Sequence, residues 1–216
     1  MIKTELNSLF SKKQTIEPEF AELEQLCRKD YIPIIDRDAA DFLKIQLQLL
    51  KPKHILEIGT AYGFSALLMA EYTPASSRIT TIEINEQRAL TARKFLQKYG
   101  FADKVDVKIG DALDILQYLR QKFDFIFLDA AKGQYLYLFD YIFELLKPGG
   151  LLVSDNVLYK AEVLTDDEVR HKIRTIVNNL RKYLKIVMNH PELDSTIIAA
   201  GDGIALSRRK LENEKS

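Results

Sequence analysis

The sequence has few of the residues that crosslink small proteins: its 216 residues include one cysteine, Cys27, three histidines and no tryptophan. A single cysteine excludes an intrachain disulfide, and no Cys and His residues have the spacing of zinc ligands. An excess of one charge is also missing, because 31 Lys and Arg balance 31 Asp and Glu. This balance argues against both a polybasic nucleic-acid protein and an acidic disordered chain.

Long hydrophobic runs are absent as well. No stretch approaches the roughly 18 apolar residues of a membrane span, and residues 1–13 lack the apolar centre of a signal peptide. We therefore expect an unprocessed, cytoplasmic protein without a membrane segment. Because no repeat or flexible linker divides the chain, we expect one domain over residues 1–216, with N-terminal helices in 1–50, an α/β core in 51–210 and a polar tail in 211–216.

Short β-rich runs alternate with longer amphipathic segments after Pro52. The expected strands are 54–60, 78–84, 105–110, 123–129 and 151–154, and the expected helices are 63–72, 86–99, 112–120, 134–146 and about 167–184. Strands separated by helices form parallel sheets, whereas the runs 195–200 and 203–207 are too close for a crossover and predict an antiparallel hairpin. The pattern predicts an α/β fold with a doubly wound, seven-stranded, mostly parallel sheet that binds ligands at the carboxyl ends of its strands.

Three strand ends carry the features of a nucleoside site. Gly59 and Gly63 follow the first strand, where glycine allows the backbone to approach a ligand closely. Ala61 breaks the G-x-G-x-x-G pattern of dinucleotide enzymes, which disfavours a dehydrogenase. Glu83 ends the second strand, where a carboxylate can accept hydrogen bonds from ribose hydroxyls. Gly110-Asp111-Ala112 follows the third strand and offers an acceptor for an adenine amino group.

The next two strand ends carry a second group of polar residues. Asp129 ends the fourth strand, and Asp155 and Asn156 follow the fifth. Three oxygen ligands suit a hard cation such as Mg²⁺, with Ca²⁺ as an alternative. Lys132 lies three residues beyond Asp129, and the charged form of its amine is disfavoured close to a divalent ion. Lys132 is therefore a candidate general base.

These motifs resemble a known family. The run Glu57-x-Gly59-x-x-x-Gly63 with Glu83 is similar to the first two motifs of class I S-adenosylmethionine-dependent methyltransferases, which have a Rossmann-like fold. Asp129-Ala130-Ala131-Lys132 with Asp155-Asn156-Val157 resembles the metal-dependent O-methyltransferases that act on catechol and caffeoyl-CoA. The resemblance covers about residues 30–210. It implies that Asp129, Asp155 and Asn156 bind the metal, that Lys132 and Asp129 are catalytic, and that Ile35, Glu57, Gly59, Ser65, Glu83, Asp111, Ala112 and Asp129 border S-adenosylmethionine.

The acceptor should offer two adjacent oxygens, because a chelated cation can acidify and position one of them. Catechols have such a pair, and so does 5-hydroxyuracil. Four segments of the sequence, 129–135, 155–160, 188–191 and 201–203, look like those of bacterial tRNA 5-hydroxyuridine methyltransferases, which produce 5-methoxyuridine at the wobble position. That resemblance implies a tRNA substrate and a homodimer. The alternatives are a catechol-type or caffeoyl-CoA-like acceptor, and a non-catalytic module that binds S-adenosylmethionine or tRNA.

Charge gives the tRNA hypothesis some support. Between residues 168 and 210 the sequence has nine Lys and Arg against four acids, an excess of five in a chain of net charge zero. Such an excess is typical of a phosphate-binding surface, although a solvated helix face explains it equally well.

Overall fold

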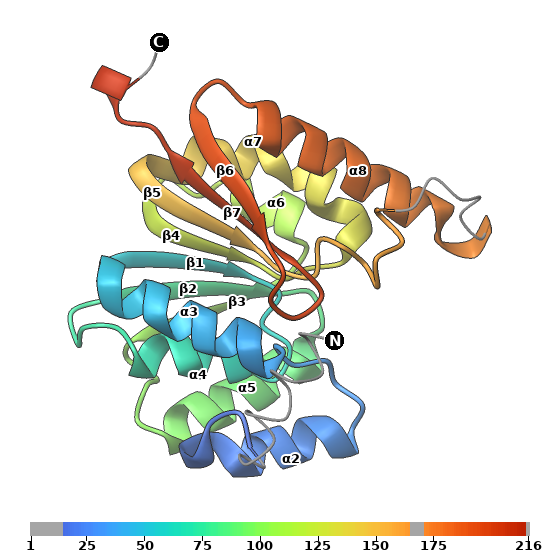
Figure 1. Cartoon of the computed structure of the whole chain (residues 1–216). Coiled ribbons are helices and arrows are strands. Elements are labelled where there is room, and N and C mark those ends of the chain that lie inside the picture. The colour runs from blue at the N-terminus through green and yellow to red at the C-terminus, as the bar shows by residue number, and fades with distance from the viewer. Residues whose placement is uncertain (1–14, 165–170, 215–216) are drawn as a thin grey trace.

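The computed structural model describes residues 15–164 and 171–214, and these form one seven-stranded sheet in the order β3-β2-β1-β4-β5-β7-β6 (Figure 1). The strands are β1 (His54–Ile58), β2 (Arg78–Glu83), β3 (Val105–Ile109), β4 (Phe123–Leu128), β5 (Leu146–Ser154), β6 (Leu193–Ile198) and β7 (Ile204–Arg209). The α-helices are α2 (Ala21–Lys29), α3 (Arg37–Leu50), α4 (Phe64–Glu71), α5 (Glu86–Lys98), α6 (Ala112–Leu116), α7 (Tyr135–Leu145) and α8 (Arg174–Asn189). Short 3₁₀ turns are η1 (Pro18–Phe20), η2 (Lys132–Gln134), η3 (His171–Ile173) and η4 (Glu212–Glu214).

The pairing of the strands confirms the predicted fold. Strands β1 to β5 pair in parallel with their neighbours, and β7 runs antiparallel to both β5 and β6. Ile58 pairs with Leu128, and Leu128 pairs with Ser154. The residues that follow these strands are therefore brought to one edge of the sheet.

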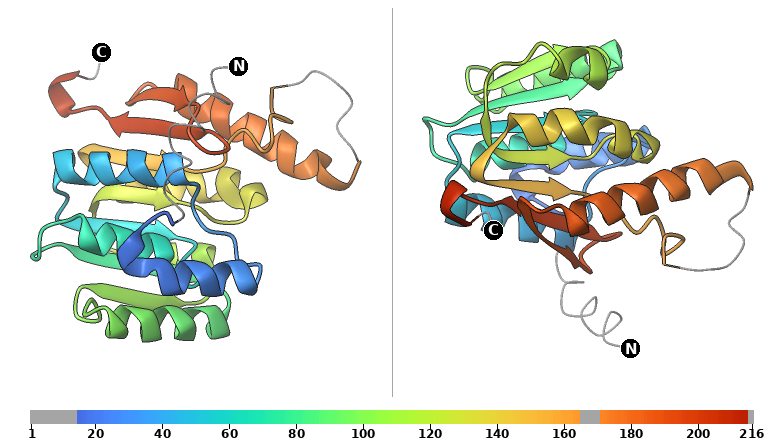
Figure 2. Two further views of the ribbon diagram at one scale, coloured as in Figure 1. Left: turned by 60° about the horizontal axis from the view of Figure 1, so that its bottom comes forward. Right: turned by 90° about the horizontal axis from the view of Figure 1, so that it is seen from above.

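Helices cover both faces of the sheet (Figure 2). Helices α3, α4 and α5 pack on one face, where Ile55 of β1 is buried, and α6, α7 and α8 pack on the other, where Leu56 and Ile58 are buried. Burial on both faces explains why the central strand β4 is apolar at every position except Asp124 rather than alternating. None of the helices in the described ranges is long and apolar enough to span a membrane.

Three elements differ from the sequence prediction. Helix α6 ends at Leu116 rather than near residue 120, because Tyr118 and Leu119 donate to carbonyls only three residues back and close the helix with tight turns. Strand β5 begins at Leu146 rather than at Leu151, and the run 147–150, between the expected helix and the expected strand, lies within it beside a shift in the β4–β5 register. Helix α8 continues to Asn189, and its expected first residues, with Glu168 and Arg170, lie outside the described ranges.

Candidate active site

A cleft of about 520 Å³ lies at the carboxyl ends of β1, β2, β3 and β4. This is the edge at which doubly wound sheets bind ligands, and the volume is within the range of small-molecule sites. Seven of the predicted site residues line it: Gly59, Glu83, Asp111, Ala112, Asp129, Lys132 and Asn156.

The turn after β1 brings the backbone close to that of β4. Gly59 has a φ of +107°, and a Cβ atom at this position would lie 2.1 Å from the carbonyl oxygen of Asp129. Only glycine allows this approach without strain. The turn therefore sets the distance between the first glycine motif and the carboxylate that follows β4.

The Glu83 carboxylate is buried at the end of β2 and joins two backbone segments. Its Oε2 accepts a hydrogen bond from the Ala61 N–H (2.8 Å), and its Oε1 accepts one from the Asn85 N–H (2.9 Å). A carboxylate has about four acceptor positions, so two remain for hydroxyl donors from a ligand. Glu83 is thus held in place and can still bind a ribose.

Asp111 plays a similar double role after β3. Its Oδ1 accepts a hydrogen bond from the Leu113 N–H (2.8 Å), which caps the short helix α6, while the side chain also lines the cleft. Gly110, with a φ of +147°, turns the chain from β3 toward this cap. The acceptor predicted for an adenine amino group is therefore at the cleft wall.

Glu57 lies behind the cleft, not in its wall as the family resemblance implied. It is fully buried in β1, where it accepts hydrogen bonds from the hydroxyls of Ser65 and Thr81. Burial raises the pKa of Glu57 to about 7. Its place in the sheet makes it a support for Ser65 rather than a direct ligand contact.

Ser65 and Ile35 line a small hollow of about 20 Å³ that adjoins the cleft. Pro33, Ile34 and Ala61 line both spaces, and none of the three was among the predicted site residues. Apolar residues between two helices resemble ordinary core packing, and the break at Pro33 was the one signal that could have identified this loop. The segment before α3 thus forms part of the wall on the side of the β1–α4 turn.

Asp129, Lys132 and Asp155 form the charged part of the site. Lys132 Nζ lies 2.6 Å from Asp129 Oδ1, and the pair is partly exposed to the cleft. Asp155 is 1% exposed, and burial together with the nearby Asp129 carboxylate raises its pKa to about 7. Ionising Asp155 is therefore costly unless a positive charge is added to the site.

The Asp155 carboxylate has one oxygen to spare. Its Oδ1 accepts hydrogen bonds from the backbone N–H (2.7 Å) and the side-chain amide (3.3 Å) of Asn156, whereas its Oδ2 is buried without a partner among the residues that the structure describes. An unpaired buried carboxylate oxygen requires an explanation, and a cation provides one. The described residues contain no cluster of three acidic, His or Cys side chains, so the candidate ligands are two carboxylates and the Asn156 amide.

Part of the basic excess near the C-terminus forms contacts within the fold. Arg209 donates to the carbonyls of Phe143 and Leu146, and Arg181 donates to those of Glu162 and Val163. Arg208 pairs with Glu214, and Lys210 donates to the Pro191 carbonyl. These contacts account for four of the nine cations and weaken the charge argument for a phosphate-binding surface.

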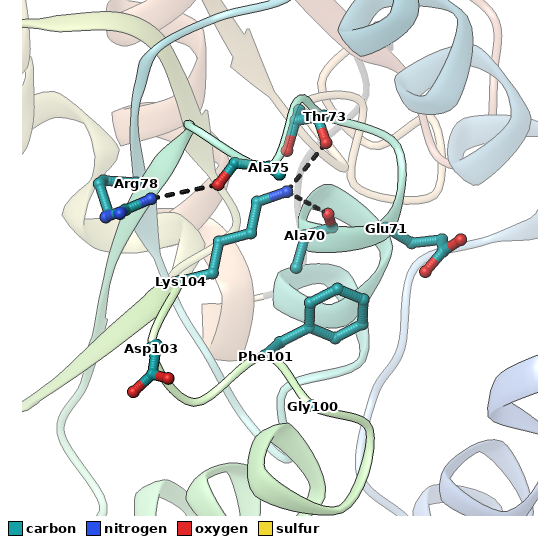
Figure 3. A pocket seen from close by; sticks show the side chains of 9 residues that line it. All are labelled: Ala70, Glu71, Thr73, Ala75, Arg78, Gly100, Phe101, Asp103 and Lys104. Carbon is teal, nitrogen blue, oxygen red and sulfur yellow. Dashed lines mark hydrogen bonds between the residues drawn. The ribbon is translucent and has the colours of Figure 1, made fainter.

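A second hollow lies at the opposite ends of the strands (Figure 3). Lys104 extends into it and donates to the carbonyls of Ala70 and Thr73, while Arg78 donates to the Ala75 carbonyl. Lys104 thus stabilises the negative end of the α4 dipole. Both cationic side chains form hydrogen bonds with nearby backbone carbonyls, so we assign them a role in stabilising the fold rather than in binding a ligand.

The sheet, its glycine turn and the carboxylate at the end of β2 form the type of site at which α/β proteins bind nucleosides, here beside a candidate cation site. The chain belongs to the O-methyltransferase family, whose sequence profile matches residues 11–210.

Two relatives and one solved structure illustrate the similarity. Caffeoyl-CoA O-methyltransferase 1 of Eucalyptus globulus is 35% identical over 179 residues, which are 80% of this chain and 73% of that protein. Catechol O-methyltransferase of Niastella koreensis is 33% identical over 175 residues, 77% of each chain. The O-methyltransferase of Bacillus cereus in complex with SAH superposes with a TM-score of 0.83 at 26% identity, covering 97% of this chain and 100% of that one.

Proposed function

We propose that the protein transfers the methyl group of S-adenosylmethionine to one of two adjacent oxygens of its acceptor, with the help of a divalent cation such as Mg²⁺. The observation that carries this proposal is the convergence of Asp129, Lys132, Asp155 and Asn156 beside a cleft that already has the glycine turn and Glu83. The SAH complex of the Bacillus cereus relative supports the choice of methyl donor.

The donor would occupy the 520 Å³ cleft. Gly59 allows close approach of the backbone, Glu83 has free acceptor positions for the ribose, and Asp111 can accept from the adenine amino group. Ser65 and Ile35 would border the donor from the adjoining hollow, and Glu57 would act through Ser65. When bound, S-adenosylmethionine supplies a methyl group on a positively charged sulfur.

The cation would be held by Asp129, Asp155 and Asn156. The unpartnered Asp155 Oδ2 and the raised pKa of this carboxyl both fit a bound positive charge. When bound, Mg²⁺ supplies Lewis-acid polarisation of two acceptor oxygens. Oxygen and amide ligands are those that Mg²⁺ prefers.

Lys132 and its neighbours take part in the transfer of the proton from the acceptor hydroxyl. In its protonated form, Lys132 Nζ is held by Asp129 Oδ1 and by the hydroxyl of Tyr135. In its neutral form, the same nitrogen accepts the proton of the acceptor hydroxyl, which makes the oxygen nucleophilic. The departing thioether is neutral, so no acid is needed on the opposite side.

The relatives favour a small acceptor of the catechol or caffeoyl-CoA type, since those are the acceptors in their names. The segments 129–135, 155–160, 188–191 and 201–203 favour a second candidate, 5-hydroxyuridine at the wobble position of tRNA. Both acceptors have adjacent oxygens and fit the same chemistry. The homodimer and the cytoplasmic location stay predictions from the sequence.

One experiment tests the chemistry and the acceptor together. Purified protein with labelled S-adenosylmethionine is incubated with a free catechol, with caffeoyl-CoA and with tRNA that contains 5-hydroxyuridine, each with Mg²⁺ and with a chelator. We expect transfer to at least one acceptor and its loss on chelation, while SAH binding, measured by calorimetry, persists. Transfer that survives complete removal of divalent ions would overturn the metal role, and the acceptor that is methylated identifies the substrate class.

A further inference from the structure

The hydroxyl of Tyr135 connects three parts of the candidate site. Tyr135 begins α7 and is completely buried. Its Oη lies 2.9 Å from Lys132 Nζ, 2.9 Å from the Leu128 carbonyl oxygen and 2.9 Å from the Asp155 carbonyl oxygen. One buried oxygen thus contacts the candidate base and the ends of both β4 and β5.

The hydrogen-bonding capacity of a phenol determines in which of these contacts the hydroxyl donates and in which it accepts. The hydroxyl has a single proton, which is shared between the two carbonyl oxygens, and its lone pairs are left for the Lys132 ammonium. Leu128 is the last residue of β4, and Asp155 follows β5 directly. The phenol therefore joins the two strand ends while it accepts from the amine between them.

We propose that Tyr135 is a positioning residue for methyl transfer, which acts through Lys132 and Asp155 without touching the substrates. Its hydroxyl holds Lys132 Nζ at 2.6 Å from Asp129 Oδ1 and fixes the backbone from which the Asp155 carboxylate projects. This inference rests on the proposed function. Groups that orient metal ligands and bases from behind commonly change metal affinity or activity by roughly 10–100-fold when removed.

The chain contains a matched control. Tyr183 of α8 is also completely buried, and its ring packs edge-on against that of Tyr135 with centroids 5.4 Å apart. Its hydroxyl forms a hydrogen bond of 2.5 Å with Ser154 Oγ, one residue before Asp155. Tyr183→Phe removes a buried hydroxyl from the same aromatic cluster but no contact to Lys132 or to Asp155.

The experiment compares Tyr135→Phe with Tyr183→Phe, because both variants keep the aromatic ring. Folding is measured by urea denaturation, the reaction by kcat and KM, and the cation site by titration with Mn²⁺ alone, followed by electron paramagnetic resonance. We expect Tyr135→Phe to lower kcat and Mn²⁺ affinity by about tenfold or more with little change in the KM for S-adenosylmethionine. Tyr183→Phe should keep both within about twofold while losing comparable stability.

The outcomes separate this inference from the proposed function. Wild-type kcat and Mn²⁺ affinity in Tyr135→Phe would overturn the positioning role, and so would equal losses in the two variants. If the wild-type protein fails to bind Mn²⁺, the proposed cation site fails and the role of Tyr135 fails with it. Reduced Mn²⁺ affinity in Tyr135→Phe alone supports the role even before an acceptor is identified.

Discussion

The Glu83 carboxylate stabilises the fold through two backbone contacts and keeps acceptor positions that suit a ligand. It accepts from the N–H groups of Ala61 and Asn85, and thereby joins the β1–α4 turn to the start of α5. A ribose that binds to the remaining acceptor positions meets a group that is already ordered, so little conformational entropy is lost on binding.

Replacing Glu83 with Gln tests this role. The change keeps the size of the side chain but removes the charge, and we expect the affinity for SAH to fall by about 1–3 kcal/mol. Isothermal titration calorimetry measures the effect, and Glu86→Gln is the control, because Glu86 is exposed three residues further along. Unchanged affinity in Glu83→Gln would exclude a ribose contact.

Gly59 allows a second comparison between single residues. Gly59 and Gly100 both have positive φ, but a Cβ at Gly100 would meet no atom within 4 Å, whereas one at Gly59 would overlap the Asp129 carbonyl. Alanine should cost roughly 1–2 kcal/mol of conformational strain at either position and a further 1–3 kcal/mol or so of overlap at Gly59. Urea unfolding measures both variants, and equal losses would show that the close approach to β4 is unimportant.

At the scale of elements, the end of β7 carries two arginines with different tasks. Arg209 lies over the Phe143 ring with its guanidinium carbon 4.2 Å from the centroid, and it donates to the carbonyls of Phe143 (2.9 Å) and Leu146 (2.6 Å). It therefore joins β7 to the end of α7 and the start of β5. Arg208 instead forms an exposed pair with Glu214.

We expect Arg209→Gln to lower the free energy of unfolding by about 1–3 kcal/mol, because two partly buried carbonyls lose a charged donor. Arg208→Gln should change stability little, since exposed ion pairs contribute weakly. Chemical denaturation of the two variants checks the difference, and similar behaviour would contradict it.

The polar residues at the strand ends could be predicted from the sequence, whereas the buried side chains that hold them in place could not. Glu83, Asp129 and Asp155 follow apolar runs, and parallel strands bring their ends together, so pattern alone indicated a common site. Tyr135 reads as an ordinary core residue of an amphipathic helix, and only tertiary structure shows that its hydroxyl reaches two strand ends. The family resemblance gave Glu57 a place beside the methyl donor, and only tertiary structure shows that this carboxylate is buried against Ser65 and Thr81.

The start of β5 shows a similar limit at the level of elements. Lys147-Pro148-Gly149-Gly150 has the composition of a helix stop and turn. The β4–β5 register shifts at this point, from Phe123 opposite Leu146 to Phe125 opposite Leu151, and the run is accommodated within an extended strand. Residues 147–150 lie in this gap in the pairing with β4, and Gly149 has a φ of +78°, so the run interrupts the ladder without ending the strand.

At the scale of the whole molecule, stability should depend on the protonation of Glu57. Its folded-state pKa of about 7 lies above the ordinary value of 4.5, so the folded protein holds this proton more tightly than the unfolded chain does. The contribution is fully present below about pH 4.5 and is lost as the pH rises to about 7, a change of about 3 kcal/mol. The pKa of Asp155 is also raised, so this group likewise makes the free energy of unfolding fall as the pH rises.

Glu57→Gln isolates the first contribution, because Asp155 remains in both proteins. We expect the free energy of unfolding of the variant to fall less steeply between about pH 5 and about pH 7 than that of the wild type. Urea denaturation across this range provides the two curves. If the free energies of unfolding of the two proteins change in parallel with pH, the pKa of Glu57 is not raised in the folded protein.

The order of the strands has a consequence for how the protein is made. Strand β7 lies between β5 and β6, so β6 leaves the ribosome before the strand with which it pairs. Until residues 204–209 emerge, the backbone groups along one side of β5 have no strand beside them, and β6 cannot join the sheet. A chain cut after Gly203 would retain every residue that lines the cleft and still present open strand edges, which are templates for aggregation. A nonsense mutation after Gly203 is therefore expected to make the protein insoluble although every residue that lines the candidate site is still present.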